Sequence, residues 1–262
     1  MKLKEITEKK IKSKELNEIH KTLDTLYLRK KDKDILLSCL SQFRDKKDII
    51  MDLGLPNKLN VLLYGLPGTG KSSAILAIAT YLKRDLYYVD LKHCETNEDL
   101  HSIFEYVNKN VLQGGIIVME DIDAMTDVIK KRSNRDISND HIEKKSSHDH
   151  KSKLTLEYFL NILQGTLTLN DSIYIVTTNY IDQLDPAFYR DGRFDVKIEL
   201  KLCDHYQMNA IYNKILNRDI PRDLLQRMPE DKFSPASLIF HIKNYLFRSD
   251  TSDEEILKPF LE

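Results

Sequence analysis

One segment of the chain combines glycines, a lysine and hydroxyl residues at the spacing that phosphate binding requires. It reads Gly65, Leu66, Pro67, Gly68, Thr69, Gly70, Lys71, Ser72 and Ser73. An apolar run precedes it and a helical pattern follows, which is the context of a P-loop, where backbone N–H groups and a helix start surround a phosphate. We expect Lys71 to reach the outer phosphates and the Ser72 hydroxyl to bind Mg²⁺.

A second group of residues is an acid pair at the end of a later apolar run. Residues 116–119 are Ile-Ile-Val-Met, and Glu120 and Asp121 follow directly. α/β folds bind their ligands at the carboxyl ends of the strands. One acid can therefore complete the Mg²⁺ shell while its neighbour polarises an attacking water. We predict Glu120 as the metal ligand and Asp121 as the catalytic base, and leave open whether the two roles are exchanged.

A third group supplies an amide and two guanidinium groups. Asn179 ends a further apolar run, so its amide can bond a γ-phosphate or the attacking water. Arg190 and Arg193 follow, and a guanidinium that faces a γ-phosphate stabilises the charge of the transition state. The alternative is that both arginines are surface residues paired with Asp191 or Asp195.

Five apolar runs must position these groups, and helical patterns lie between them. The runs are residues 59–64, 86–91, 115–120, 172–178 and 195–200. Strand and helix in alternation predict an α/β fold, a five-stranded parallel sheet covered by helices, followed by a small α-helical lid. We expect a charged, frayed or helical lead-in at 1–23, a large α/β domain at 24–201 with a polar insertion at 130–153, and the lid at 202–262.

Composition narrows the class of protein. The 262 residues carry a formal net charge of −1, with an isoelectric point near 6.7, which does not favour nucleic acid as a partner. No apolar run approaches the roughly 20 residues that a membrane helix needs. The three cysteines are far apart, which predicts reduced thiols in an intracellular protein. Acidic residues among the first twenty do not fit a mitochondrial presequence, so we expect a soluble chain in the cytoplasm rather than the mitochondrion.

Taken together, the motifs resemble the AAA branch of the AAA+ ATPases. The stretch from Thr178 to Asp195 is similar to that family's second region of homology. The resemblance implies ATP and Mg²⁺ as cofactors, with Asn179 as the sensor-1 residue. It also implies that Arg190 and Arg193 act as arginine fingers on the neighbouring subunit, within a homo-oligomeric ring of six or seven copies.

A closer resemblance is to the mitochondrial AAA chaperones that move the Rieske protein. The shared features are the acid order Glu120-Asp121, the Lys71-Ser72-Ser73 sequence and the helix "LTLEYFLNILQG" at 154–165. Those chaperones carry a transmembrane helix and a dedicated domain before the ATPase module, and we expect neither in this chain. The resemblance therefore implies the chemistry of the ATPase module and leaves the Rieske substrate open.

The function expected is Mg²⁺-dependent ATP hydrolysis coupled to remodelling or translocation of a protein substrate. Residues 92–100 hold no aromatic residue and no glycine, so the pore loop of threading motors is not expected. The insertion at 130–153 is rich in lysine and arginine. It is interpreted either as a solvated loop or as a basic segment that attracts an acidic protein or nucleic acid. Two alternatives stay open: a nucleic-acid-associated ATPase of the clamp-loader or helicase-loader type, and a non-hydrolysing ATP-dependent switch or scaffold.

Overall fold

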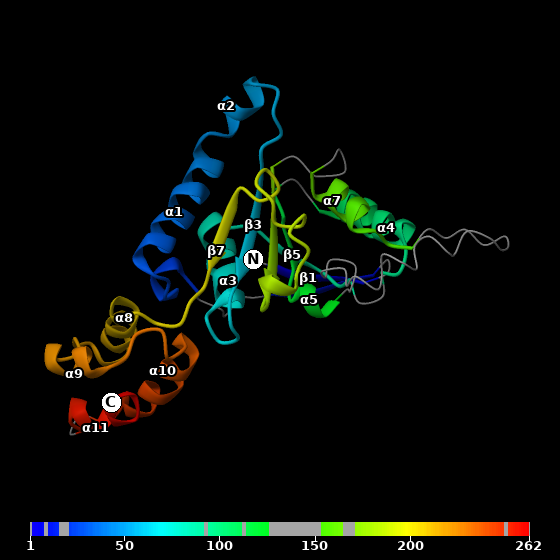
Figure 1. Ribbon diagram of the computed structural model, residues 1–262. Helices are drawn as coiled ribbons and strands as arrows, with labels where there is room; N and C mark the ends of the chain where they lie inside the picture. Colours follow the sequence, from blue (N-terminus) through cyan, green and yellow to red (C-terminus); the bar gives the residue numbers. More distant parts are fainter. Residues whose placement is uncertain are drawn as a thin grey trace.

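The computed structural model describes residues 2–7, 10–15, 21–91, 94–111, 114–125, 153–164, 171–248 and 251–261. Within these ranges a sheet lies at the centre of the larger part of the molecule (Figure 1). It has seven strands, in the order β2-β1-β4-β5-β6-β3-β7. The strands are β1 Lys2–Thr7, β2 Lys10–Glu15, β3 Lys58–Tyr64, β4 Leu86–Val89, β5 Ile116–Met119, β6 Ser172–Thr178 and β7 Val196–Glu199.

The five predicted strands are confirmed, and all of their neighbouring pairs are parallel. β5 pairs with β4 and β6, and β3 pairs with β6 and β7. The carboxyl ends of β3, β5 and β6 therefore meet at one edge of the sheet. That edge brings together the segments that contain the P-loop, the acid pair and Asn179.

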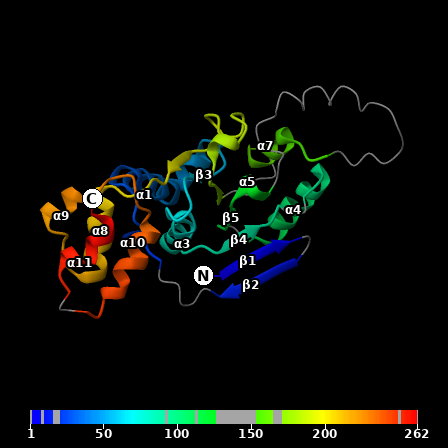
Figure 2. The same ribbon diagram turned by 60° about the horizontal axis from the view of Figure 1, so that its bottom comes forward.

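Two further strands come from the N-terminal segment. β1 and β2 form an antiparallel hairpin, and β1 pairs in parallel with β4, so the hairpin extends the sheet at the β4 edge (Figure 2). The expectation of a frayed or helical lead-in was wrong for these residues. Charged residues are common in edge strands, where they discourage further pairing, and so a charged sequence did not exclude a strand.

Helices cover both faces of the sheet. On one face α1 and α3 pack on alternate strand residues such as Val61, Ile175 and Ile198. On the other face α4 and α7 pack on Leu62, Ile117 and their neighbours, and Tyr87 is buried there as a core residue. The helices of this part are α1 Lys30–Asp45, α2 Lys47–Asp52, α3 Lys71–Leu82, α4 Asn97–Asn110, α5 Ile122–Met125 and α7 Leu156–Gln164, with 3₁₀ turns η1 Leu23–Thr25 and η3 Ile181–Gln183.

The chain after β7 is helical and has a hydrophobic cluster of its own. Met208, Leu238 and Phe260 belong to this cluster, which draws its buried members from residues 203–260. Ser234 caps α10, since its side chain accepts a hydrogen bond from the Ser237 N–H and Pro235 follows it. The helices are α8 His205–Leu216, α9 Arg222–Arg227, α10 Pro235–Ile242 and α11 Asp253–Leu257, with 3₁₀ turns η4 Lys243–Tyr245 and η5 Lys258–Phe260. The separate core supports our proposal that a lid begins near residue 202.

Most of the insertion predicted at 130–153 lies outside the described residues. Its last residue, Lys153, forms an isolated backbone bridge with Thr96. In the described parts of the chain, no helix has both the length and the apolar character that crossing a membrane requires.

Candidate active site

The P-loop joins β3 to α3 and passes close to other backbone. Gly65 has a φ of +142°, and a Cβ atom at this position would overlap the carbonyl oxygen of Leu200. Gly70 has a φ of +109° and is the residue immediately before α3. Residues with side chains rarely adopt these angles, so the two glycines allow the sharp turn that leads into the helix.

Lys71 folds back over the loop. Its side chain is buried, and Nζ donates to the carbonyl oxygens of Gly65 at 2.6 Å and Leu66 at 3.1 Å. Burial lowers the pKa of Lys71, while the nearby carboxylates oppose that shift; they belong to Asp121, Asp123 and Glu120. The ammonium group is thus held beside the loop by weak neutral acceptors, which a phosphate oxygen can replace.

The predicted metal ligands lie in contact. The hydroxyl of Ser72, on the first turn of α3, donates to Oε1 of Glu120, just after β5, at 2.6 Å. Mg²⁺ prefers hard oxygen ligands and is commonly held by one or two carboxylates together with waters and substrate phosphates. A hydroxyl and a carboxylate oxygen side by side next to a P-loop fit that donor set.

The predicted base and sensor also lie in contact. Nδ2 of Asn179 donates to Oδ1 of Asp121 at 3.1 Å. Asp121 has a φ of +47°, and its backbone N–H donates to Oγ1 of Thr177 at 2.9 Å. The left-handed conformation of this non-glycine residue is therefore supported by a specific bond from β6.

Asp123 is a positioning residue to which the sequence analysis gave no role. It is buried, and Oδ1 accepts from the Thr178 hydroxyl at 2.7 Å and from the Asn179 backbone N–H at 3.2 Å. These bonds fix the end of β6 against α5 and so hold the backbone that carries the Asn179 amide. The sequence signal that could have pointed to Asp123 is its position, two residues after the acid pair.

A cavity of about 370 Å³ lies above the P-loop. It is lined by Pro67, Gly68, Gly70, Lys71, Ser72, Ser73, Asp121, Asn179 and Ala236. Ala236 belongs to α10, and its N–H donates to the Gly68 carbonyl at 3.2 Å. The start of the lid helix thus lies at the loop, where its N-terminus favours an anion.

A second pocket, of about 300 Å³, adjoins this cavity and shares four lining residues with it. We call it the side pocket. It lies between the segment at 25–27 and α10, and its walls include Leu26, Tyr27 and Ile239. The sequence gives no sign of this pocket, because a short apolar stretch without a motif does not reveal that it will lie against residues 235–243.

The two arginines lie away from the cavity. The described residues that line it include neither Arg190 nor Arg193. Nδ2 of Asn60, near the start of β3, donates to the Arg193 carbonyl at 3.0 Å. The P-loop begins five residues later, at Gly65, and at the rise of a strand about 16 Å separates Asn60 from Gly65. An Arg193 guanidinium N–H donates to the Ala187 carbonyl. Its pKa is lowered by partial burial and by the neighbouring charge of Arg190.

The alternative pairing with nearby acids is wrong for the described residues. Asp191 bonds to Nζ of Lys197 at 2.6 Å, and Oδ2 of Asp195 accepts from the backbone N–H of Asn60 at 2.7 Å. Arg190 is exposed. In the part of the chain that the structure describes, neither arginine forms an ion pair with Asp191 or Asp195.

Comparison with known proteins matches the chain to one family. The family described as "ATPase family associated with various cellular activities (AAA)" matches residues 61–202. An Arabidopsis thaliana protein named as an AAA-ATPase is 34% identical over 226 residues, covering 83% of this chain and 47% of that protein. The mitochondrial AAA-ATPase ASD of the same plant is 33% identical over 263 residues, covering 92% of this chain and 50% of its own length.

The chain spans about half the length of the plant relatives it matches. It matches a viral relative over nearly all of that relative's length. This is a protein of Acanthamoeba polyphaga mimivirus whose name places it in the AAA ATPases; it is 32% identical over 197 residues, covering 70% of this chain and 97% of that protein. The chain belongs to the AAA family of ATPases.

Proposed function

We propose that this chain hydrolyses ATP with Mg²⁺ at the cavity above the P-loop. The observation that carries the proposal is the meeting of two polar pairs at one edge of the sheet. Ser72 contacts Glu120, and Asn179 contacts Asp121. The first pair suits a metal ion, and the second suits a water held for attack on a phosphate.

In this proposal the P-loop binds the triphosphate and the side pocket takes the base. The Lys71 ammonium exchanges its carbonyl partners for phosphate oxygens. The apolar walls formed by Leu26 and Ile239 suit a flat ring, and backbone groups at 25–27 suit its polar edge. Ser72 and Glu120 would hold Mg²⁺, which when bound neutralises charge on the phosphate oxygens.

Asp121 then acts as the general base. Its carboxylate takes a proton from the attacking water, whose oxygen bonds to the γ-phosphorus while the bond to the β–γ bridging oxygen breaks. ADP and inorganic phosphate leave. The Asn179 amide holds the Asp121 carboxylate in place from the neighbouring strand, and Asp123 holds Asn179.

We propose further that the active form is a ring of six or seven copies and that it remodels or translocates a protein. The separation of Arg190 and Arg193 from their own P-loop supports action on a neighbour's nucleotide. Family resemblance supports the ring and the protein substrate. The plant relatives are about twice as long as this chain. The partners and the substrate of the ring are therefore part of this proposal.

We propose that this chain shares its ATPase chemistry with the Rieske-protein chaperones, because it has their acid order, Glu120-Asp121, and a similar helix at 154–165. The relatives reported above are named as AAA ATPases, and ASD is named as mitochondrial. For this chain we propose the cytoplasm. Imaging of the full-length tagged protein decides between the two compartments.

The test is ATP turnover with and without Mg²⁺, with ATP binding measured in parallel. Asp121→Asn is expected to lower kcat about 10²–10⁴-fold, the contribution of a general base, while ATP still binds. Asp223→Asn, at an exposed carboxylate of α9, is the matched control and is expected to behave as wild type. Binding without turnover in the wild-type protein would refute hydrolysis and favour the ATP-dependent switch.

A further inference from the structure

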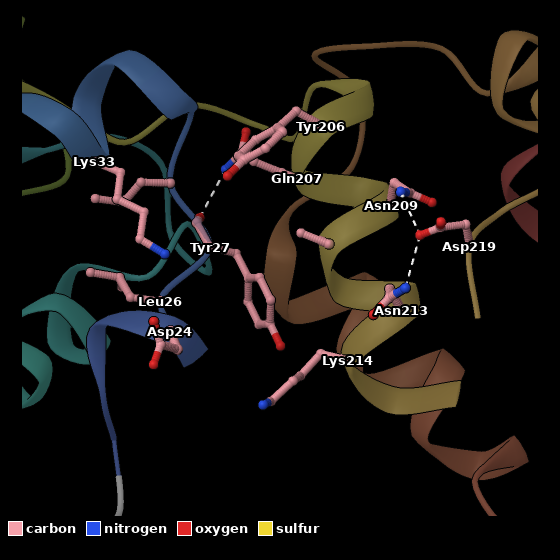
Figure 3. Close-up of a pocket in the computed structure, with 12 residues that line it drawn as sticks. Asp24, Leu26, Tyr27, Lys33, Tyr206, Gln207, Asn209, Asn213, Lys214 and Asp219 are labelled. Carbon is pink, nitrogen blue, oxygen red and sulfur yellow. Dashed lines mark hydrogen bonds between the residues drawn. The ribbon is translucent and has the colours of Figure 1, made fainter. Parts of the chain in front are cut away.

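Gln207 is a buried amide of α8 whose two ends bond to different parts of the molecule. Nε2 donates to the carbonyl oxygen of Tyr27 at 2.8 Å, as Figure 3 shows. Oε1 accepts from the backbone N–H of Asp204 at 3.2 Å, which completes the cap of α8. One end of the side chain is thus fixed to the lid and the other to the segment that precedes α1.

The segment that accepts this bond is a thin wall between two spaces. Leu26 and Tyr27 line the side pocket, and they also line a cavity of about 290 Å³ on the α8 side. Figure 3 shows this second cavity between the segment and α8, with Gln207 reaching across to Tyr27. Leu26 is buried in the core of the larger part, while the Tyr27 carbonyl is held from the side of the second cavity by Gln207.

A second bond ties the same segment to the lid. Nη2 of Arg29 donates to the Leu202 carbonyl at 3.2 Å, and the guanidinium also pairs with Asp231. The ring of Tyr27 packs against the hydrophobic cluster of the lid. The wall of the side pocket is therefore linked to α8 and its neighbours by several contacts, and the Gln207 side chain, which is buried, supplies one of them.

We infer that Gln207 is a positioning residue for the nucleotide: it sets the wall of the side pocket according to the position of α8. This inference rests on the proposed function, in which the base of ATP occupies that pocket. When α8 moves, the Tyr27 carbonyl moves with it, and the space for the base changes.

Gln207→Glu tests this inference with little change in volume. The glutamate keeps an oxygen for the Asp204 N–H but places an oxygen, in place of a donor, against the Tyr27 carbonyl. Dissociation constants are measured for ATP and for tripolyphosphate, which has no base and reports on the P-loop alone. The variant is expected to bind ATP about tenfold more weakly, which corresponds to about 1.4 kcal/mol, and tripolyphosphate within about twofold of wild type.

The matched control is Asn213→Asp on the same helix. Its amide donates to Asp219 at 2.8 Å, a bond that stays within the lid, so both ligands are expected to bind as in wild type. Arg29→Gln, at a more exposed side chain, is the second variant. It should weaken the binding of ATP but not of tripolyphosphate, and by a smaller factor than Gln207→Glu. It carries the test if Gln207→Glu does not fold.

The outcomes separate this inference from the proposed function. Equal weakening of both ligands by Gln207→Glu would overturn the inference and leave a general structural role. Unchanged ATP affinity in Gln207→Glu, beside a wild type that binds and hydrolyses ATP, would overturn the inference alone. If wild type binds ATP no more tightly than tripolyphosphate, the base does not use the side pocket, and the inference is overturned with that part of the proposed function.

Discussion

At the scale of single residues, Gly65 is constrained by its conformation and by the backbone beside it. Its φ is +142°, and an added Cβ would overlap the Leu200 carbonyl, whereas Gly192 has a φ of +87° with open space around it. Gly192→Ala is expected to cost about 1 kcal/mol of unfolding free energy, from conformation alone. Gly65→Ala should cost at least about 2 kcal/mol more, because backbone must also move. Urea unfolding of the two variants measures the difference; equal losses would contradict the close approach.

The cysteines give a residue-scale prediction about pH. Burial, with a smaller contribution from neighbouring carboxylates, raises the pKa of Cys94 to about 12 and that of Cys203 to about 12. The thiolate is the reactive form, so alkylation of both by iodoacetamide should be slow at pH 8 and should still be rising with pH at pH 10. Mass spectrometry of the native protein checks this, with urea-unfolded protein as the control. Rapid native labelling of Cys203 would contradict its burial.

The site residues that the sequence could identify are those within local motifs. Lys71 and Ser72 follow glycines at a fixed spacing, and the acid pair follows an apolar run. The contribution of Asp123 and Gln207 depends instead on contacts with residues 55 and 180 positions away, at Thr178 and Tyr27. No local pattern reports such contacts, and so these roles had to come from the structure.

At the scale of elements, Asp171 joins segments at the end of the sheet opposite the P-loop. Its carboxylate pairs with Arg84 at 2.9 Å, before β4, and with Lys47 at 3.0 Å, on α2. Asn57, just before β3, donates to the same carboxylate at 3.1 Å. One acid at the start of β6 thus connects three other segments.

Asp171→Asn is expected to lower the unfolding free energy by about 1–3 kcal/mol at pH 7, since it removes charged hydrogen bonds from a mostly buried group. Burial alone would raise the pKa of Asp171, but the bonds from Arg84 and Lys47 outweigh it and leave the pKa lowered. A lowered pKa stabilises the fold above the unfolded value, near 4, and this stability is lost as pH falls through the folded value.

The difference in unfolding free energy between wild type and Asp171→Asn should therefore be largest above about pH 5 and should shrink in acid. Urea unfolding at a series of pH values checks this. Asp45→Asn, at an exposed carboxylate paired with Arg44, is the control and should match wild type. A difference that stays constant down to low pH would contradict the role of the charge.

Four of the five predicted strands, β3 to β6, could be predicted because they are mostly buried and read as apolar runs, while β7, at the edge of the sheet, alternates buried and exposed residues. β6, for example, is buried throughout its seven residues, and the sequence marked the same bounds, 172–178. The hairpin of β1 and β2 could not be predicted this way. Its sequences, KLKEIT and KIKSKE, have no apolar run, and it joins the sheet by backbone pairing with β4.

At the scale of the whole molecule, the cavity above the P-loop and the two arginines lie on different parts of the surface. Figure 1 shows the lid helices beside the carboxyl ends of the strands, with α2 at the opposite end. Arg193 bonds near the start of β3, whereas the P-loop follows its end. A surface that holds the nucleotide and a separate surface that supplies arginines can pair head to tail, which is the type of contact that closes into a ring.

The measurement that tests this account most directly is ATP turnover by a mixture of two inactive variants. Lys71→Ala lacks the P-loop lysine but keeps its arginines, and Arg193→Ala keeps its P-loop but lacks one arginine. Each alone is expected to be nearly inactive. Mixed in equal amounts and allowed to assemble, they should recover turnover at about one quarter of the interfaces, where an intact site meets an intact arginine. A mixture that assembles and stays as inactive as its components would contradict arginines that act across subunits.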